Sequence, residues 1–136
     1  MSPVQSRTPR LHVAVVSKNP ETLDGLETYL QRAGVMTSST RQLERSAQIV
    51  SGVSAVVVFP DDYEWEAVIG ALTACMGSNP GALPVVVTNA PQRFDSVVWP
   101  DDTAIPLVVP KPAWGWTILD AIRAHLVEPF DRESGP

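Results

Sequence analysis

Few side chains in this sequence have the type and spacing that enzyme or metal chemistry requires. The chain has 136 residues, with one cysteine, Cys75, and two histidines, His12 and His125. A zinc site needs several such ligands, and a catalytic triad needs a nucleophile, a base and an orienting acid. No third partner accompanies the histidines, and Cys75 falls on the apolar stripe of a predicted helix, where it is a small core residue. We therefore predict that the protein is not an enzyme and has no metal site.

Two pairs of adjacent aspartates are the remaining candidates for chemistry. Asp61 and Glu64 have the spacing of a capping box at the start of a helix, and Asp62 suits the positive end of the same helix dipole. Asp101 and Asp102 follow a proline, which is typical of a turn. These ordinary roles are sufficient for both pairs, so neither pair by itself indicates a reaction.

Charge and composition exclude several classes of function. The formal net charge is −5, and the ten lysines and arginines are scattered along the sequence. Such a chain lacks the basic stripe that follows a phosphate backbone, so we predict no nucleic-acid binding. The apolar runs are too short to span a membrane, and the N-terminus lacks the apolar core of a secretory signal. A single cysteine cannot form an internal disulfide, which favours the cytoplasm.

The apolar residues predict a sheet of buried parallel strands. Four Val-rich runs are nearly continuous, which is typical of strands that are covered on both faces. Stretches with a helical period separate them, and alternation of strands and helices implies a parallel α/β sheet. Val35–Thr40 is more polar and suits an edge strand. The four buried runs are Leu11–Val16, Val53–Phe59, Leu83–Val87 and Ile105–Val109.

Caps and prolines predict where the helices begin and end. Asn19 is the N-cap of the first helix, which ends at Gly34. The last helix runs from about Trp116 to Val127, with Pro129 as a stop. Residues 90–104 are the least regular part of the chain. We predict a flexible N-terminus over residues 1–10, one domain over 11–128 and a flexible C-terminal tail over 129–136.

Three segments resemble the receiver domains of two-component response regulators. They are VAVVSKNPETLDGLETYL, LPVVVTNA and VVPKPAWGWTILDAI, each at the end of a predicted strand. The resemblance places Thr88 at the position whose hydroxyl touches the phosphoryl group, and Lys111 with Pro112 at the Lys-Pro signature. It implies a flavodoxin-like, doubly wound, five-stranded parallel sheet of order 2-1-3-4-5, in which helix four is short or irregular.

The same alignment implies a degenerate phosphorylation pocket. Ser17 and Lys18 stand where the family has metal-binding acids, and Phe59 stands where it has the phospho-accepting aspartate. Receiver chemistry needs a carboxylate nucleophile and a Mg²⁺ ion that neutralises the transferring phosphoryl group. Since an ammonium at a metal position repels Mg²⁺, we expect weak or absent Mg²⁺ binding and no other cofactor. The pocket residues that this resemblance implies are Ser17, Lys18, Phe59, Thr88 and Lys111.

Asp61 and Asp62 leave a second interpretation open. They follow Phe59 closely and would approach the pocket if the third strand were shifted or bulged, so either could be an alternative phospho-acceptor for a histidine kinase. An ion pair between Lys18 and Asp61 is a further expectation. Lys111 also has two interpretations, as a pocket residue or as a solvated lysine at the end of a strand.

Three of the four tryptophans indicate an interaction face. Trp99, Trp114 and Trp116 lie around the irregular fourth helix and the start of the last helix, whereas Trp65 belongs to a core stripe. Tryptophan is enriched at interface anchors. The alternative is that the three residues cover a gap left by a shortened helix four.

The leading hypothesis is a phosphorylation-independent, receiver-like signalling module. It would bind a protein partner or a second copy of itself through the face formed by helix four, strand five and helix five. The alternative is an atypical receiver that is still phosphorylated at Asp61 or Asp62. A small-ligand site at the carboxyl ends of the strands is a third possibility, because open α/β sheets bind ligands there.

Overall fold

A computed structural model describes residues 11–99 and 105–134 of the chain. The predicted N-terminal segment 1–10 lies outside the described residues, as do Asp101 and Asp102. Five strands form one sheet of order β2-β1-β3-β4-β5, in which every neighbouring pair is parallel. The predicted flavodoxin-like order is therefore confirmed. The strands are β1 (His12–Val16), β2 (Met36–Thr40), β3 (Ala55–Val58), β4 (Leu83–Thr88) and β5 (Leu107–Pro110).

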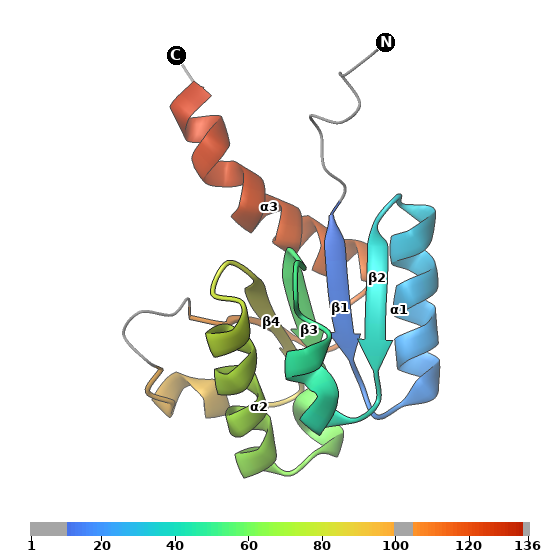
Figure 1. Cartoon of the computed structure of the whole chain (residues 1–136), viewed down its shortest axis with the longest axis vertical. Coiled ribbons are helices and arrows are strands. Elements are labelled where there is room, and N and C mark those ends of the chain that lie inside the picture. The colour runs from blue at the N-terminus through green and yellow to red at the C-terminus, as the bar shows by residue number, and fades with distance from the viewer. Residues whose placement is uncertain (1–10, 100–104, 135–136) are drawn as a thin grey trace.

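Helices cover both faces of this sheet (Figure 1). Among the described residues, none of them is both long and apolar enough to cross a membrane. In the described parts of the chain, three are α-helices and three are short 3₁₀ helices. They are α1 (Pro20–Arg32), η2 (Leu43–Gln48), η3 (Pro60–Asp62), α2 (Trp65–Ser78), η4 (Pro91–Ser96) and α3 (Gly115–Ser134).

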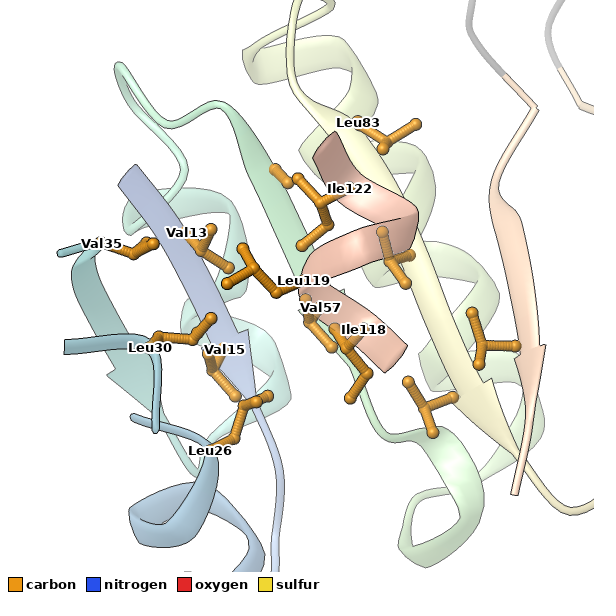
Figure 2. Packing of buried hydrophobic residues seen from close by; sticks show 14 of the residues in the cluster. Val13, Val15, Leu26, Leu30, Val35, Val57, Leu83, Ile118, Leu119 and Ile122 are labelled. Atoms are coloured by element: carbon orange, nitrogen blue, oxygen red, sulfur yellow. The ribbon is translucent and has the colours of Figure 1, made fainter. Parts of the chain in front are cut away.

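The core is divided into two clusters because successive strand residues point to opposite faces. Val13, Val15 and Val57 face α1 and α3, where Leu30 and Ile122 are fully buried (Figure 2). The intervening residues of the same strands face α2, η2 and η4. Their cluster includes Ala14, Val16, Val56, Val58, Val68 and Leu72. Because β1, β3 and β4 are buried on both faces, they form a rigid base for the loops at their carboxyl ends.

The first helix begins and ends as its sequence predicts. The side-chain oxygen of Asn19 accepts hydrogen bonds from the backbone N–H groups of Glu21 and Thr22, which are otherwise unpaired at a helix start. Gly34 follows the helix with a φ of 85°, which only glycine adopts at little cost. The chain can therefore turn directly into β2, where it forms the predicted edge strand.

Two helix predictions have different outcomes. Helix four is the six-residue 3₁₀ helix η4, so the prediction of a short or irregular element is confirmed. The predicted end of the last helix near Val127 is wrong, because α3 continues to Ser134. A proline removes one helical hydrogen bond and can kink a helix without ending it, so Pro129 does not stop α3. The proposed domain limits remain predictions.

Candidate functional site

The carboxyl ends of the strands bring distant segments into register at one edge of the sheet. Beyond the paired strands, the Phe59 amide donates to the Val16 carbonyl at 2.9 Å. The Lys111 amide likewise donates to the Thr88 carbonyl at 3.0 Å. These bonds extend the β1–β3 and β4–β5 ladders by one residue, so Thr88 and Lys111 lie side by side at the end of the sheet. The peptide bond after Lys111 is cis.

Asp61 is the residue around which this edge is organised. It lies in η3, which turns the chain immediately after β3, and its carboxylate reaches the ends of β4 and β5. Oδ1 accepts a 2.6 Å hydrogen bond from the Thr88 hydroxyl. Oδ2 accepts a 2.9 Å bond from the Asn89 amide and lies 3.0 Å from Nζ of Lys111. One carboxylate therefore joins three elements of the fold.

The surroundings of Asp61 favour its ionised form. Partial burial raises the pKa of the carboxyl group, but the Thr88 hydroxyl, the Asn89 amide and the Lys111 ammonium together lower it further than burial raises it. The net result is a pKa below the usual value. The side chains of Lys111 and Asp61 retain 30% and 23% of their exposure, so the pair is only partly shielded from solvent. At neutral pH the site holds a negative carboxylate next to a positive ammonium.

Comparisons with solved structures identify this fold. A receiver domain protein from Methanospirillum hungatei superposes with a TM-score of 0.70 at 13% identity, covering 91% of this chain and 99% of its own. The orphan response regulator HP1043 of H. pylori gives 0.68 at 19% identity, covering 87% and 99%. The anti-anti-sigma factor PhyR from Bartonella quintana gives 0.65 at 14% identity, covering 96% of this chain and 54% of its own. This is the receiver fold.

No family model matches the sequence, and no curated protein matches it either. At these identities the likeness of the solved structures concerns the fold alone. The predicted resemblance in architecture is thus confirmed. The roles of individual pocket residues follow from the contacts that they make in this chain and not from the likeness to solved structures.

The other predicted pocket residues are not gathered around Asp61. The Ser17 hydroxyl is buried, and it accepts a hydrogen bond from the Asn19 amide at 3.2 Å and donates to the Asn19 carbonyl. Phe59 is 8% exposed and packs into the core facing α1 and α3. Lys18 is exposed and lines a separate cleft with residues of the β2–η2 segment. Of the five predicted residues, Thr88 and Lys111 alone contact Asp61 in the described structure.

This edge of the receiver fold does not fit Mg²⁺. Magnesium prefers several oxygen ligands, above all carboxylates. Throughout residues 11–99 and 105–134, no three His, Cys, Asp or Glu side chains gather closely enough to hold a metal. At the strand ends the hydroxyl of Ser17 serves the α1 turn, and the Asp61 carboxylate is already bonded to Thr88, Asn89 and Lys111. The donor set thus lacks the carboxylates that a receiver metal site needs.

Two local expectations about the aspartates are wrong. Asp61 does not cap a helix, because α2 begins at Trp65 with Glu64 as its N-cap and no side-chain cap bond. The expected ion pair between Lys18 and Asp61 is also absent from the described residues, since Asp61 pairs with Lys111 instead. The physical reason is the 3₁₀ turn of η3, which directs Asp61 across the sheet edge toward β5. Asp62 follows in the same turn without a side-chain hydrogen bond in the described structure.

The backbone amide of Asn89 is a site element that the sequence analysis missed. It donates to Asp61, and the next amide, of Ala90, donates to the Thr88 hydroxyl at 3.1 Å. The sequence carries a weak signal for this arrangement, namely polar residues directly after a buried strand. A backbone donor, however, has no residue type that a motif could reveal.

An aromatic cavity of about 260 Å³ borders Asp61 and Thr88. Its lining includes Trp65, whose ring meets Phe94 edge-on with centroids 4.9 Å apart. The Arg93 guanidinium lies 4.1 Å from the centroid of the Trp65 ring, a distance typical of a cation–π contact. Trp65 and η4 are thus packed together beside the site.

The tryptophans of the predicted interaction face separate into two places. Trp114 and Trp116 stack with centroids 5.4 Å apart and an interplanar angle of 6°, and they remain 59% and 53% exposed. Trp99 is partly buried and packs against the cluster on the α2 face. Trp99 therefore fits the alternative that it covers the short helix four, whereas the stacked pair is open to solvent. The interaction itself remains a prediction.

Proposed function

We propose that this chain is a cytoplasmic, receiver-like signalling module that acts through protein contacts and does not require phosphorylation. The position of the Asp61 carboxylate carries the proposal. By family resemblance, Thr88 and Lys111 are the residues that contact a phosphoryl group in a receiver. Here the hydroxyl and the ammonium both bind Asp61 at 3.0 Å or less. An internal carboxylate thus takes the place of phosphoryl oxygens.

The same contacts support a fixed conformation of the segment that follows β4. The Thr88 hydroxyl donates to Asp61 and accepts from the Ala90 amide, and the Asn89 amide also donates to Asp61. These bonds hold the chain at the entry to η4 (Pro91–Ser96). In an ordinary receiver such bonds would depend on a transient phosphoryl group. In this chain the ligand is part of the polypeptide.

Phosphorylation by a histidine kinase at Asp61 or Asp62 is the second candidate. It is favoured by one observation, that the Asp61 carboxylate lies beside both retained residues and keeps 23% of its side-chain exposure. The lack of a fitting Mg²⁺ donor set opposes it, because carboxylate phosphorylation in receivers depends on metal. Transfer would attach a phosphoryl group to a carboxylate oxygen that already accepts hydrogen bonds.

Incubation with acetyl phosphate and Mg²⁺, followed by intact-protein mass measurement, separates the two candidates. We expect no added phosphoryl group and no change in amide NMR shifts of Thr88, Asn89 and Lys111 when Mg²⁺ and beryllofluoride are added. Incorporation that is abolished by Asp61→Ala and retained in Asp62→Ala would establish the second candidate. The reverse pattern would assign the acceptor to Asp62.

We further propose that the contacts involve helix four, β5 and the start of α3, and that Trp114 and Trp116 are anchors for a partner protein or a second copy. A rigid, exposed aromatic pair offers a large contact area at small entropic cost. A photo-crosslinking residue in place of Trp116 should give a discrete protein adduct in cells, or a dimer with the purified chain. The same residue at Met36, which is 47% exposed on β2 at the opposite edge of the sheet from β5, is the control. Equal adducts at both positions, or none at either, would contradict this interface.

A further inference from the structure

A second hollow lies at the carboxyl ends of β1 and β2, toward the edge of the sheet that is opposite β5. It has a volume of about 440 Å³. The ends of β1 and β2 point to the same end of the molecule (Figure 1). Its lining consists of three cationic and two neutral polar residues, with no acidic and no apolar residue. They are Lys18, Arg41, Arg45, Thr40 and Gln42.

This concentration of positive charge is unusual for the chain as a whole. The formal net charge is −5, and the ten lysines and arginines are spread along the sequence. Folding nevertheless brings Lys18 to Arg41 and Arg45, because β1 and β2 pair in parallel and end side by side. Like charges in one hollow repel one another, and a bound anion would remove that cost.

The three cations lack acidic partners in the described structure. Within the described residues, one pair of oppositely charged side chains lies within 4 Å, namely Lys111 and Asp61. Lys18, Arg41 and Arg45 therefore form no ion pair there. Burial raises the pKa of the Tyr63 hydroxyl, Asp62 and Glu44 raise it further, and Arg41 lowers it, so Arg41 lies near these acids. Neither acid lines the hollow, so a ligand there would meet the cations without a carboxylate among the lining residues.

The backbone that carries these residues is held by specific bonds. The Ser17 amide, next to Lys18, donates to the Thr40 carbonyl at 3.3 Å. The Tyr63 hydroxyl donates to the Arg41 carbonyl at 2.7 Å, which ties the β2–η2 segment to the chain after η3. The Arg45 amide donates to the Gln42 carbonyl at 3.0 Å. The cations therefore extend from a supported frame.

We propose that this hollow, called here the basic cleft, binds the phosphate groups of a soluble small molecule. Guanidinium groups match phosphate oxygens in bidentate fashion, and Lys18 adds a compact charge. Every lining residue type can donate a hydrogen bond, and none of the lining residues is of an apolar type. The cleft therefore favours phosphate groups, and two linked phosphates suit three cations in charge.

The basic cleft is distinct from the Asp61 site, although the Tyr63 hydroxyl connects the backbone of the two regions. The two share no lining residue, and they lie toward opposite edges of the sheet, one at β2 and the other between β3, β4 and β5. Lys18 therefore contributes its charge to the basic cleft and not to the Asp61 site.

The test is a titration of the full chain with inorganic pyrophosphate, followed by amide NMR and calorimetry at low salt. We expect saturable shifts at Lys18, Arg41 and Gln42 and none at Thr88 or Lys111. The affinity should fall as salt is added, because the interaction is between charges near the surface. Citrate at equal concentration, an anion of comparable charge without phosphate, should bind at least about tenfold more weakly.

Variants show whether the basic cleft itself is responsible. Arg41→Gln and Arg45→Gln should each weaken pyrophosphate binding about tenfold, the loss of one charge-assisted contact. Arg32→Gln is the matched control, since Arg32 is exposed in the last turn of α1, at the opposite end of the sheet. Unchanged folding of each variant is checked by its amide spectrum. Binding that is unaffected by both cleft variants, equal binding of citrate, or no saturable shift would overturn the proposal.

Discussion

Oδ1 of Asp61 accepts a 2.6 Å hydrogen bond from the Thr88 hydroxyl, across 27 positions of sequence. The bond connects the 3₁₀ turn after β3 to the last residue of β4. Thr88 is 2% exposed, so its hydroxyl needs a partner, and Asp61 supplies one together with the Ala90 amide. The contact thus gives the buried Thr88 hydroxyl a hydrogen-bond partner, and it also holds the chain that follows β4 in place.

The first prediction concerns the pH dependence of this contact. The folded-state pKa of Asp61 lies below its usual value, so the interactions of its carboxylate stabilise the folded protein at neutral pH, and this contribution is lost as pH falls through the folded pKa. Asp61→Asn should reduce the free energy of unfolding at pH 7 by about 1 kcal/mol, and this difference should shrink below pH 4. Urea unfolding at several pH values measures it.

Asp62→Asn is the matched control for that experiment. Asp62 is adjacent to Asp61, and no hydrogen bond of its side chain is found in the described part of the chain. Its replacement should leave the pH profile of stability close to that of the wild type. If the two variants have the same profile, the assigned role of Asp61 is wrong.

A second prediction concerns the start of α3. A Cβ atom at Gly115 would lie 2.8 Å from Cγ and Cδ2 of Tyr29. Alanine normally stabilises a helical position relative to glycine by about 1 kcal/mol, but this clash should reverse the sign, so that Gly115→Ala destabilises by about 1–3 kcal/mol. Thermal and urea unfolding give the value.

Gly70 provides the control, because it lies inside α2 and a Cβ there meets nothing within 4 Å. Gly70→Ala should stabilise the protein by about 0.5–1 kcal/mol. Adding Tyr29→Ala to Gly115→Ala should recover part of the loss. Independent, additive effects of Gly115→Ala and Tyr29→Ala would show that the α1–α3 contact is not responsible.

A third prediction tests the core that supports the site. Ile122 is fully buried between α3 and the sheet (Figure 2). Ile122→Ala should cost about 2–5 kcal/mol in unfolding free energy, from lost burial and the cavity left behind. Val98→Ala, at a residue that is 92% exposed, should change stability by less than about 0.5 kcal/mol. Comparable losses in both variants would contradict the described packing.

The reactivity of Cys75 is the fourth prediction. Its thiol is 2% exposed, and burial raises its pKa, although the Ser46 hydroxyl lowers it in part. The thiolate is the reactive form, so a thiol reagent at pH 8 should label native protein far more slowly than protein unfolded in urea. The labelling rate is followed by absorbance. Rapid labelling of the native state would contradict a core position for Cys75.

The fold could be predicted from the sequence because its signals are local and repeated. The Val-rich runs of β1, β3 and β4 are buried on both faces, as their continuity indicates, and Asn19 and Gly34 define the limits of the first helix. The end of α3 could not be predicted from Pro129, since a proline weakens a helix without determining whether the helix stops.

The site was only partly predictable. The positions of Thr88 and Lys111 follow from strand ends, but the direction of the Asp61 side chain depends on the 3₁₀ turn of η3. The spacing of Asp61 and Glu64 indicated a helix cap instead, so the sequence did not predict this turn. The basic cleft was hidden for a different reason. Lys18 is distant in sequence from Arg41 and Arg45, and only the parallel pairing of β1 and β2 makes them neighbours.

The Asp61 carboxylate has one consequence for how such a module is regulated. Because this ligand of Thr88 and Lys111 is encoded in the chain, no phosphatase can remove it and no metabolic supply of phosphodonor limits it. Under the function proposed above, the module would not depend on kinase activity, and its control would lie in synthesis, degradation and competition for partners.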